Sequence, residues 1–150
     1  MIVFIIRFFD ILISGLLAGI MICIWQGADS KDALEPTNFE LQQANMKTCK
    51  DKIPLLGLMT ILLTLASAAL QNHIMIIFIP LLLASLLLLI SGIITRYGNQ
   101  PINKQIQRWS KAYIPGKWEY IRDKWVSYHI YRTLITLLAF ILIILASLIN

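Results

Sequence analysis

Charged side chains are scarce in this chain. Asp, Glu, Lys and Arg make up 14% of its 150 residues, whereas about a quarter is usual for a soluble domain. Hydrophobic residues reach 58%, and the mean hydropathy is +0.73. A soluble fold of this length cannot bury so much apolar surface, because a small domain has a large surface for its volume. We therefore expect one membrane domain over residues 1–150, with its apolar excess facing lipid.

Cysteine and histidine are also rare, with two residues of each. Cys23 lies in an apolar run and Cys49 in a polar segment, and neither belongs to a CxxC or Cys/His metal-binding spacing. No GxSxG, Walker A, HExxH or dinucleotide fingerprint occurs. The sequence thus predicts no metal or haem site. The N-terminal apolar stretch is interrupted by Arg7 and Asp10 and lacks a convincing cleavage site, so we expect it to be retained.

Four long apolar runs predict four transmembrane helices, because a helix needs ~20 such residues to cross a ~30 Å hydrocarbon core. The runs cover residues 2–25, 53–70, 74–95 and 133–149. They are continuous rather than alternating, which favours helices over a β-barrel. The predicted fold class is an all-α four-helix membrane bundle, with long connections at 28–52 and 96–132 and a short link at 71–73.

The basic residues indicate the partner and the orientation of the bundle. The net charge is +5, and the Lys and Arg residues sit beside the apolar runs, which predicts contact with anionic lipid headgroups rather than nucleic acid. The connection 96–132 carries eight Lys/Arg, the connection 28–52 carries four, and the link 71–73 carries none. The positive-inside rule therefore predicts cytoplasmic long connections and both termini outside.

The connection 96–132 also predicts helices of its own. Pro101 suits the first turn of a helix, and apolar residues then recur on one helical face, with basic residues on other faces: Ile102, Ile106, Trp109 and Tyr113. This pattern predicts a basic amphipathic helix near residues 101–113 on the membrane surface. Pro115 and Gly116 end it, and a new helix from about residue 117 is expected to run into the fourth span.

Five aromatic or polar residues share one face of that final helix. Their steps of four, three, four and three place them on one stripe: Trp118, Arg122, Trp125, His129 and Arg132. One interpretation is a pocket at the cytoplasmic mouth of the bundle, where His129 moves a proton, an arginine holds an anion and the tryptophans stack on a flat ligand. The other is an interfacial anchor, since Trp and Arg are enriched at headgroup level.

Three more residues are candidates for the same mouth. Asn99 and Asn103 flank Pro101, which is either ordinary turn chemistry or a way of aiming the Asn103 amide at the pocket. Trp25 ends the first span on the same side and either joins the pocket or marks the interface.

A second polar pair lies at the opposite end of the first span. Arg7 and Asp10 are three residues apart, so they either neutralise each other near the headgroups or form an intramembrane functional pair with Gln71 and His73 nearby. The bilayer separates them from His129, so the two groups cannot form one small site. We see no polar ladder in the second and third runs that would join the two ends.

The C-terminal third resembles the anthrone oxygenase-like family. The resemblance rests on Asn99-Gln100-Pro101-Ile102-Asn103 followed by Trp109, Pro115, Trp118, Arg122, Trp125, His129 and Arg132. It is tight from residue 99 to about 138 and looser over the first span. The family consists of small four-span membrane proteins, most of them bacterial, which implies a bacterial inner membrane location.

The resemblance also implies an activity. Characterised fungal relatives oxidise an anthrone to an anthraquinone with O₂, without a metal or organic cofactor. By this resemblance His129 is the base, and Arg132 and Asn103 stabilise the substrate anion. A flat phenolic substrate would then contact the remaining candidates: Trp118, Arg122, Trp125, Asn99 and Trp25. The alternative is a non-catalytic membrane module, either a lipid-binding protein or a subunit of a membrane complex.

Overall fold

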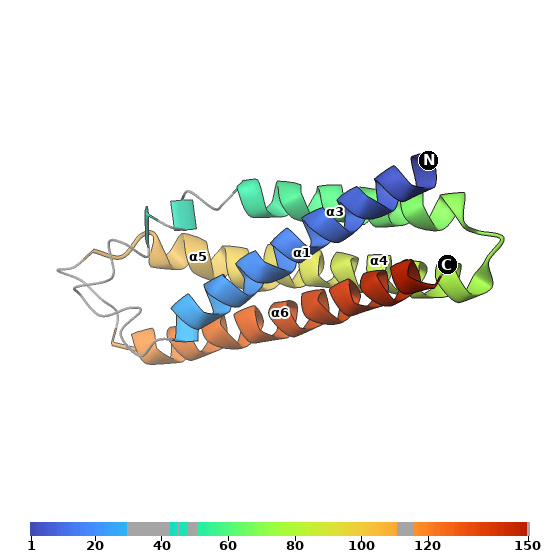
Figure 1. Ribbon diagram of the computed structural model, residues 1–150. Helices are drawn as coiled ribbons and strands as arrows, with labels where there is room; N and C mark the ends of the chain where they lie inside the picture. Colours follow the sequence, from blue (N-terminus) through green and yellow to red (C-terminus); the bar gives the residue numbers. More distant parts are fainter. Residues whose placement is uncertain (30–42, 45, 48–50, 111–115, 150) are drawn as a thin grey trace.

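The structure of the protein, a computed structural model, is an elongated bundle of helices (Figure 1). It describes residues 1–29, 43–44, 46–47, 51–110 and 116–149. The principal elements are α1 (Ile2–Asp29), α3 (Lys52–Leu70), α4 (Met75–Ile94), the π-helical segment η1 (Thr95–Asn99), α5 (Gln100–Ile106) and α6 (Trp118–Leu148). No strand occurs among the described residues. Both termini lie at the end of the bundle that carries the α3–α4 link.

Four helices are long and apolar enough to cross a membrane: Ile2–Gly27, Lys52–Leu70, Met75–Ile106 and Trp118–Leu148. The predicted all-α, four-span bundle is therefore confirmed, and the chain is an integral membrane protein. The long final helix predicted from about residue 117 begins at Trp118 and contains neither proline nor glycine up to Leu148. Such a sequence has no residue that would break the ladder of backbone hydrogen bonds.

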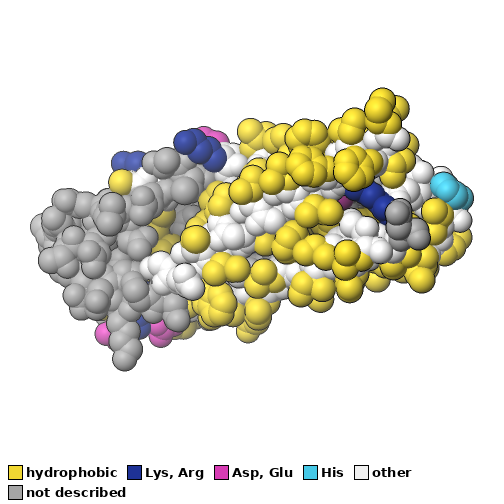
Figure 2. Space-filling view, viewed as in Figure 1, with side chains coloured by type: hydrophobic (Ala, Val, Ile, Leu, Met, Phe, Trp, Pro, Cys, Tyr) yellow, Lys and Arg dark blue, Asp and Glu magenta, His cyan; other side chains and the backbone are white. Residues whose placement is uncertain are grey.

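The bundle carries its apolar side chains on the outside and many of its hydroxyl groups on the inside. Large hydrophobic residues such as Phe4, Leu62 and Ile76 are more than half exposed, whereas Thr64 and Thr133 are fully buried. Figure 2 shows the resulting hydrophobic surface along the helices. Lipid makes this arrangement stable, since apolar groups need no burial there and small polar residues let helices approach and hydrogen-bond.

The helix that contains the third apolar run is longer than that run. Over the described residues no turn separates α4 from α5, because η1 joins them into one helix from Met75 to Ile106. Pro101 explains the local π-helical form: its ring clashes with the carbonyl four residues earlier in a regular helix, and a wider turn relieves that clash. The helix therefore continues past residue 95, where the predicted span ends, to Ile106.

The amphipathic pattern predicted for residues 101–113 packs against protein. Ile102 and Ile106 are buried in a cluster with Trp125, and Trp118 packs on its edge, while Lys104 is exposed. The apolar face thus covers α6 instead of facing lipid headgroups, because α5 continues the direction of α4 alongside α6. Residues 111–113 lie outside the described residues.

Close backbone approach at Gly98 fixes η1 against α6. A Cβ atom added at Gly98 would lie 2.9 Å from Cδ1 of the Tyr128 ring. We expect Gly98→Ala to destabilise the bundle by about 1–3 kcal/mol, because an inserted methyl group forces the packed ring or helix to shift. The midpoint of unfolding in detergent, followed by circular dichroism, measures the loss.

Gly92 offers a matched control, since a Cβ atom there would meet nothing within 4 Å. Gly92→Ala is expected to be neutral or to stabilise by up to about 1 kcal/mol, because alanine is the better helix former. Removing the ring with Tyr128→Ala should reduce the cost of Gly98→Ala. Equal effects of the two glycine substitutions would contradict the assigned contact.

Candidate functional site

Polar side chains join α6 to the long helix formed by α4, η1 and α5. Three hydrogen bonds mark this seam: Ser91 Oγ to Thr136 Oγ1 at 2.9 Å, Arg132 Nη1 to Thr95 Oγ1 at 3.4 Å, and Trp125 Nε1 to Asn103 Oδ1 at 2.7 Å. Residues 91, 95 and 103 of the long helix are separated by four and eight positions. Their partners on the antiparallel α6 follow in reverse order, at residues 136, 132 and 125. These contacts fix the register of the two helices.

By the same spacing, the next facing pair in this series is Asn99 and His129, but no hydrogen bond joins these two residues. Asn99 is 1% exposed and His129 is 3% exposed. Their four side-chain nitrogen and oxygen atoms have no hydrogen-bond partner among the described residues. Buried polar groups nearly always have partners, and leaving one unpaired costs about 1–3 kcal/mol. Asn99 and His129 thus hold hydrogen-bonding capacity that the described residues do not use.

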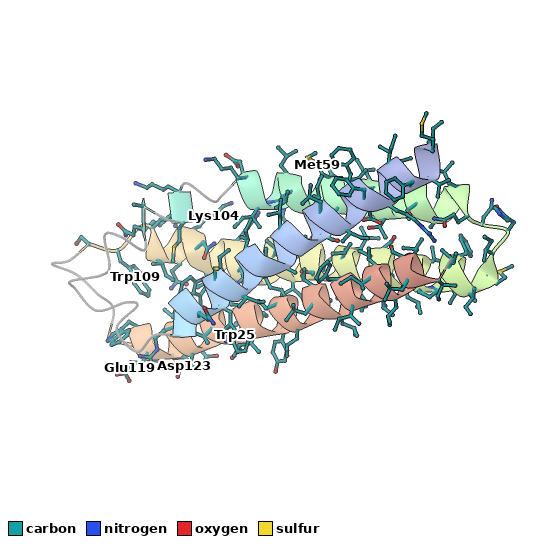
Figure 3. The ribbon with its side chains drawn as sticks, in the orientation of Figure 1. Trp25, Met59, Lys104, Trp109, Glu119 and Asp123 are labelled. Carbon is teal, nitrogen blue, oxygen red and sulfur yellow. The ribbon has the colours of Figure 1, made fainter. Side chains whose placement is uncertain are left out.

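Two further buried groups with unused capacity come from α6 and α1. Arg132 is 4% exposed, and its Nε has no partner; the indole Nε1 of Trp25 is likewise buried without one. Thr133 Oγ1 donates to the backbone carbonyl of Met21 at 3.2 Å, which fixes the register of the antiparallel helices α1 and α6. Trp25 lies one turn beyond Met21, and His129 one turn before Thr133. They are therefore level with each other, at the end of α1 where Figure 3 labels Trp25.

The unpaired groups are richer in donors than in acceptors. Arg132 Nε, Trp25 Nε1 and the Asn99 amide nitrogen donate, the Asn99 amide oxygen accepts, and a neutral imidazole adds one donor and one acceptor. Asp10, which lies towards the other end of α1, is the one buried acidic residue among those described. Among the described residues, the cation Arg132 at this mouth therefore has no buried carboxylate as a partner. A ligand that presents oxygen acceptors and negative charge complements this arrangement.

Trp125 and Asn103 support the histidine. The Trp125 ring meets the His129 ring edge-on, with centroids 4.6 Å apart and planes at 90°. Its indole N–H is held by Asn103, so the tryptophan has little freedom to tilt. The sequence-predicted residues Trp125, His129, Arg132, Asn99, Asn103 and Trp25 are thus brought together at one end of the bundle.

Trp118 and Arg122 lie farther from this level. Arg122 is two helical turns before His129, and its guanidinium carbon lies 5.2 Å from the centre of the Trp118 ring. It also donates to the exposed carboxylate of Asp123 at 2.9 Å. No described contact joins either residue to Asn99 or to His129, although Trp118, Arg122 and His129 lie on the same predicted stripe of α6.

The second and third spans bury polar side chains that the sequence analysis did not single out. α3 buries Thr60, Thr64 and Ser67, and its C-cap residue Gln71 is also buried, at successive steps of four, three and four. α4 adds Ser85 and Ser91. The spacing was visible in the sequence, but hydroxyl groups barely lower the hydropathy of an apolar run. Several of them donate to their own helix, as Thr60 does to the Leu56 carbonyl.

The expected pairing of Arg7 with Asp10 is not observed. Asp10 is 1% exposed and accepts a hydrogen bond from Thr64 Oγ1 at 2.8 Å. Arg7 donates through Nη2 to the backbone carbonyl of Ala146 in α6, at 3.1 Å. The tight packing of α1 on α3 explains the difference, because it turns Asp10 into the bundle.

These features define an integral membrane protein of four spans with a donor-rich site buried between its last two long helices. The family model for anthrone oxygenase matches residues 43–142, which is more than half of the chain. The chain therefore belongs to the anthrone oxygenase family. The match includes Asn99, His129 and Arg132, while Trp25 lies outside it. Comparison with curated proteins and with solved structures found no match.

Proposed function

We propose that this protein is a membrane-embedded oxygenase that converts the ring methylene of a flat phenolic ketone, such as an anthrone, into a carbonyl with O₂. The unpaired, donor-rich level formed by Asn99, His129, Arg132 and Trp25 carries this proposal. Family membership supports it. The substrate class comes from the family name, and the buried donors of the site complement an oxyanion.

The proposed reaction begins with proton transfer. A neutral His129 takes a proton from the methylene, and the electron pair moves onto the ketone oxygen as an enolate. Arg132 Nε–H and the Asn99 amide stabilise that oxyanion, which is the role of preorganised donors in a low-dielectric site. The electron-rich ring carbon then reacts with O₂ to give a peroxide.

The second half of the reaction returns the proton. The histidine proton goes to the outer peroxide oxygen. The remaining ring hydrogen then leaves as a proton, its electron pair forms the C=O bond and the O–O bond breaks, and the departing hydroxide combines with this second proton as water. The balance is R₂CH₂ + O₂ → R₂C=O + H₂O, so the carbon loses four electrons and O₂ gains them. Asn103 is a positioning residue in this scheme, because it holds Trp125 and through it the imidazole.

A second candidate function is a lipid-binding module without catalysis. Exposed basic residues near the same end favour it: Arg96, Lys104, Arg108, Lys117 and Lys124. They fit anionic headgroups. Lipid binding by exposed residues does not account for the buried unpaired groups of Asn99 and His129. The proposed oxygenase does account for them, so we favour it.

Oxygen uptake tests the proposed function. The protein is purified into lipid nanodiscs and given an anthrone, with O₂ consumption and the absorbance of the anthraquinone followed together. We expect one O₂ consumed for each quinone formed, at a rate well above that of empty nanodiscs, and unchanged after treatment with a metal chelator. A rate equal to that of empty nanodiscs across several phenolic ketones would reject the oxygenase.

We also propose that the basic end faces the cytoplasm of a bacterial inner membrane, in contact with anionic headgroups. In a background with both cysteines replaced by serine, Lys104→Cys should resist a membrane-impermeant maleimide in intact cells. His73→Cys, which is exposed at the other end, should react. The reverse labelling pattern would invert the orientation.

A further inference from the structure

Asp10 is a buried carboxyl group that the proposed reaction does not use. It lies eight residues after the first residue of α1, so about 12 Å along the helix axis, well within the hydrocarbon. Thr64 Oγ1 donates to its Oδ1 at 2.8 Å, whereas its Oδ2 is buried and has no hydrogen-bond partner among the described residues. One oxygen of the carboxyl group is thus satisfied and the other is not.

The hydroxyl groups around Asp10 offer acceptors rather than donors. Ser14 Oγ donates to the backbone carbonyl of Asp10 and Thr60 Oγ1 to that of Leu56. Thr64 Oγ1 also lies 2.9 Å from the Thr60 carbonyl, so that carbonyl and Asp10 Oδ1 share its one hydroxyl proton. Because each of these hydroxyl protons already has an acceptor, the hydroxyl oxygens can only accept a further hydrogen bond. By the α1–α3 register that the Asp10–Thr64 contact sets, Ser14 and Thr60 form the next facing pair.

No charge among the described residues neutralises an ionised Asp10. The buried residues that α3, α4 and α6 present in this half of the bundle are uncharged: Thr60, Thr64, Ser67, Leu81, Ser85 and Ile143. On α1 itself Arg7 is three residues away, but it donates to the Ala146 carbonyl, and its Nε has no partner. An unpaired carboxylate in hydrocarbon is costly, and such groups mark functional sites or take up a proton.

We propose that Asp10 is an exchangeable proton-binding site inside the membrane. The proton sits on Oδ2, the oxygen without a hydrogen-bond partner among the described residues, and Oδ1 remains the carbonyl oxygen that Thr64 contacts. The site takes up a single proton from the side of the membrane at which the chain termini lie. It is separate from the oxygenase site and does not depend on that function.

Loss of this proton changes which group Arg7 contacts. An Arg and an Asp three residues apart on a helix can pair, and Arg7 is the nearest cation to the new carboxylate. Pairing with Asp10 withdraws Arg7 from the Ala146 carbonyl, the hydrogen bond that ties α1 to the last turn of α6. Deprotonation should therefore loosen the contact between the two terminal helices.

Infrared spectroscopy of the full chain in nanodiscs tests the proton site. We expect a protonated-carboxyl C=O band that disappears reversibly as the pH is raised and is absent from Asp10→Asn. Thr64→Val should move the same band to higher frequency, because the carbonyl loses its hydrogen bond, and this readout stands even if Asp10→Asn fails to fold. Asp123→Asn, which alters an exposed carboxyl, should leave the band unchanged.

Spin labels on the exposed residues Phe4 and Leu148 test the consequence. Their separation should widen at high pH in the otherwise wild-type chain and stay constant in Asp10→Asn. Absence of the carboxyl band at every pH would overturn the proposal, since Asp10 would then be ionised throughout. A band that persists until the bundle unfolds would also overturn it, because the proton would not exchange. An unchanged separation would reject the coupling to Arg7.

Discussion

Replacing His129 with glutamine lowers kcat for anthrone oxidation by at least about 10²-fold, which is the lower end of what a general base contributes. Glutamine is close to histidine in size and can hydrogen-bond, but it cannot accept a proton near neutral pH. Because His129 makes no hydrogen bond to the described residues, the fold loses little. Steady-state oxygen uptake together with circular dichroism measures both quantities.

The matched control for this substitution is Ser127→Ala on the same helix. Ser127 is exposed and donates only to the backbone carbonyl of Asp123, so its removal should leave turnover unchanged. Raising the pH of the assay should not restore His129→Gln, since glutamine gains no basicity. Full activity of His129→Gln would remove the histidine from the proposed mechanism.

Replacing Arg132 with methionine should separate activity from stability. We expect kcat to fall by about 10²–10³-fold, as when one oxyanion donor is removed. The unfolding midpoint should hold or rise, because a buried cation without a carboxylate partner is exchanged for an apolar side chain of similar length. Among the described residues, the one side-chain hydrogen bond lost is the 3.4 Å contact with Thr95. Thermal unfolding and oxygen uptake on the same sample provide the comparison.

Arg132→Lys refines the test, because lysine keeps the charge but loses the planar Nε–H donor. It should recover only part of the activity. Arg96→Met is the control: Arg96 is exposed in η1 and donates to Gln100, so its loss should leave kcat unchanged. A parallel fall of activity and stability in Arg132→Met would assign the arginine a structural role instead.

Much of the fold could be predicted from the sequence because hydropathy reports directly on the lipid environment. Each continuous apolar run became a spanning helix, and the spacing of Trp125, His129 and Arg132 identified three residues that are buried together. Helical periodicity carries that information without any knowledge of packing. It also placed Trp118 and Arg122 on the same stripe. Periodicity identifies a helix face but not the point along the helix at which a site ends, so it could not exclude these two residues.

The position of Asn99 could not be predicted in the same way. A proline two residues later indicates a helix end or a turn, and only the π-helical segment keeps the helix continuous there. That continuity sets Asn99 level with His129, so the site depends on a backbone irregularity with no clear sequence signature. The burial of Asp10 was equally hidden, since a carboxyl near the end of an apolar run is usually expected at the headgroups.

The apolar cluster that contains Leu17, Leu88 and Ala139 draws residues from all four long helices. Hydrocarbon side chains conduct neither ions nor protons. In a bilayer, part of the membrane voltage therefore drops across the length of the interior that this cluster fills.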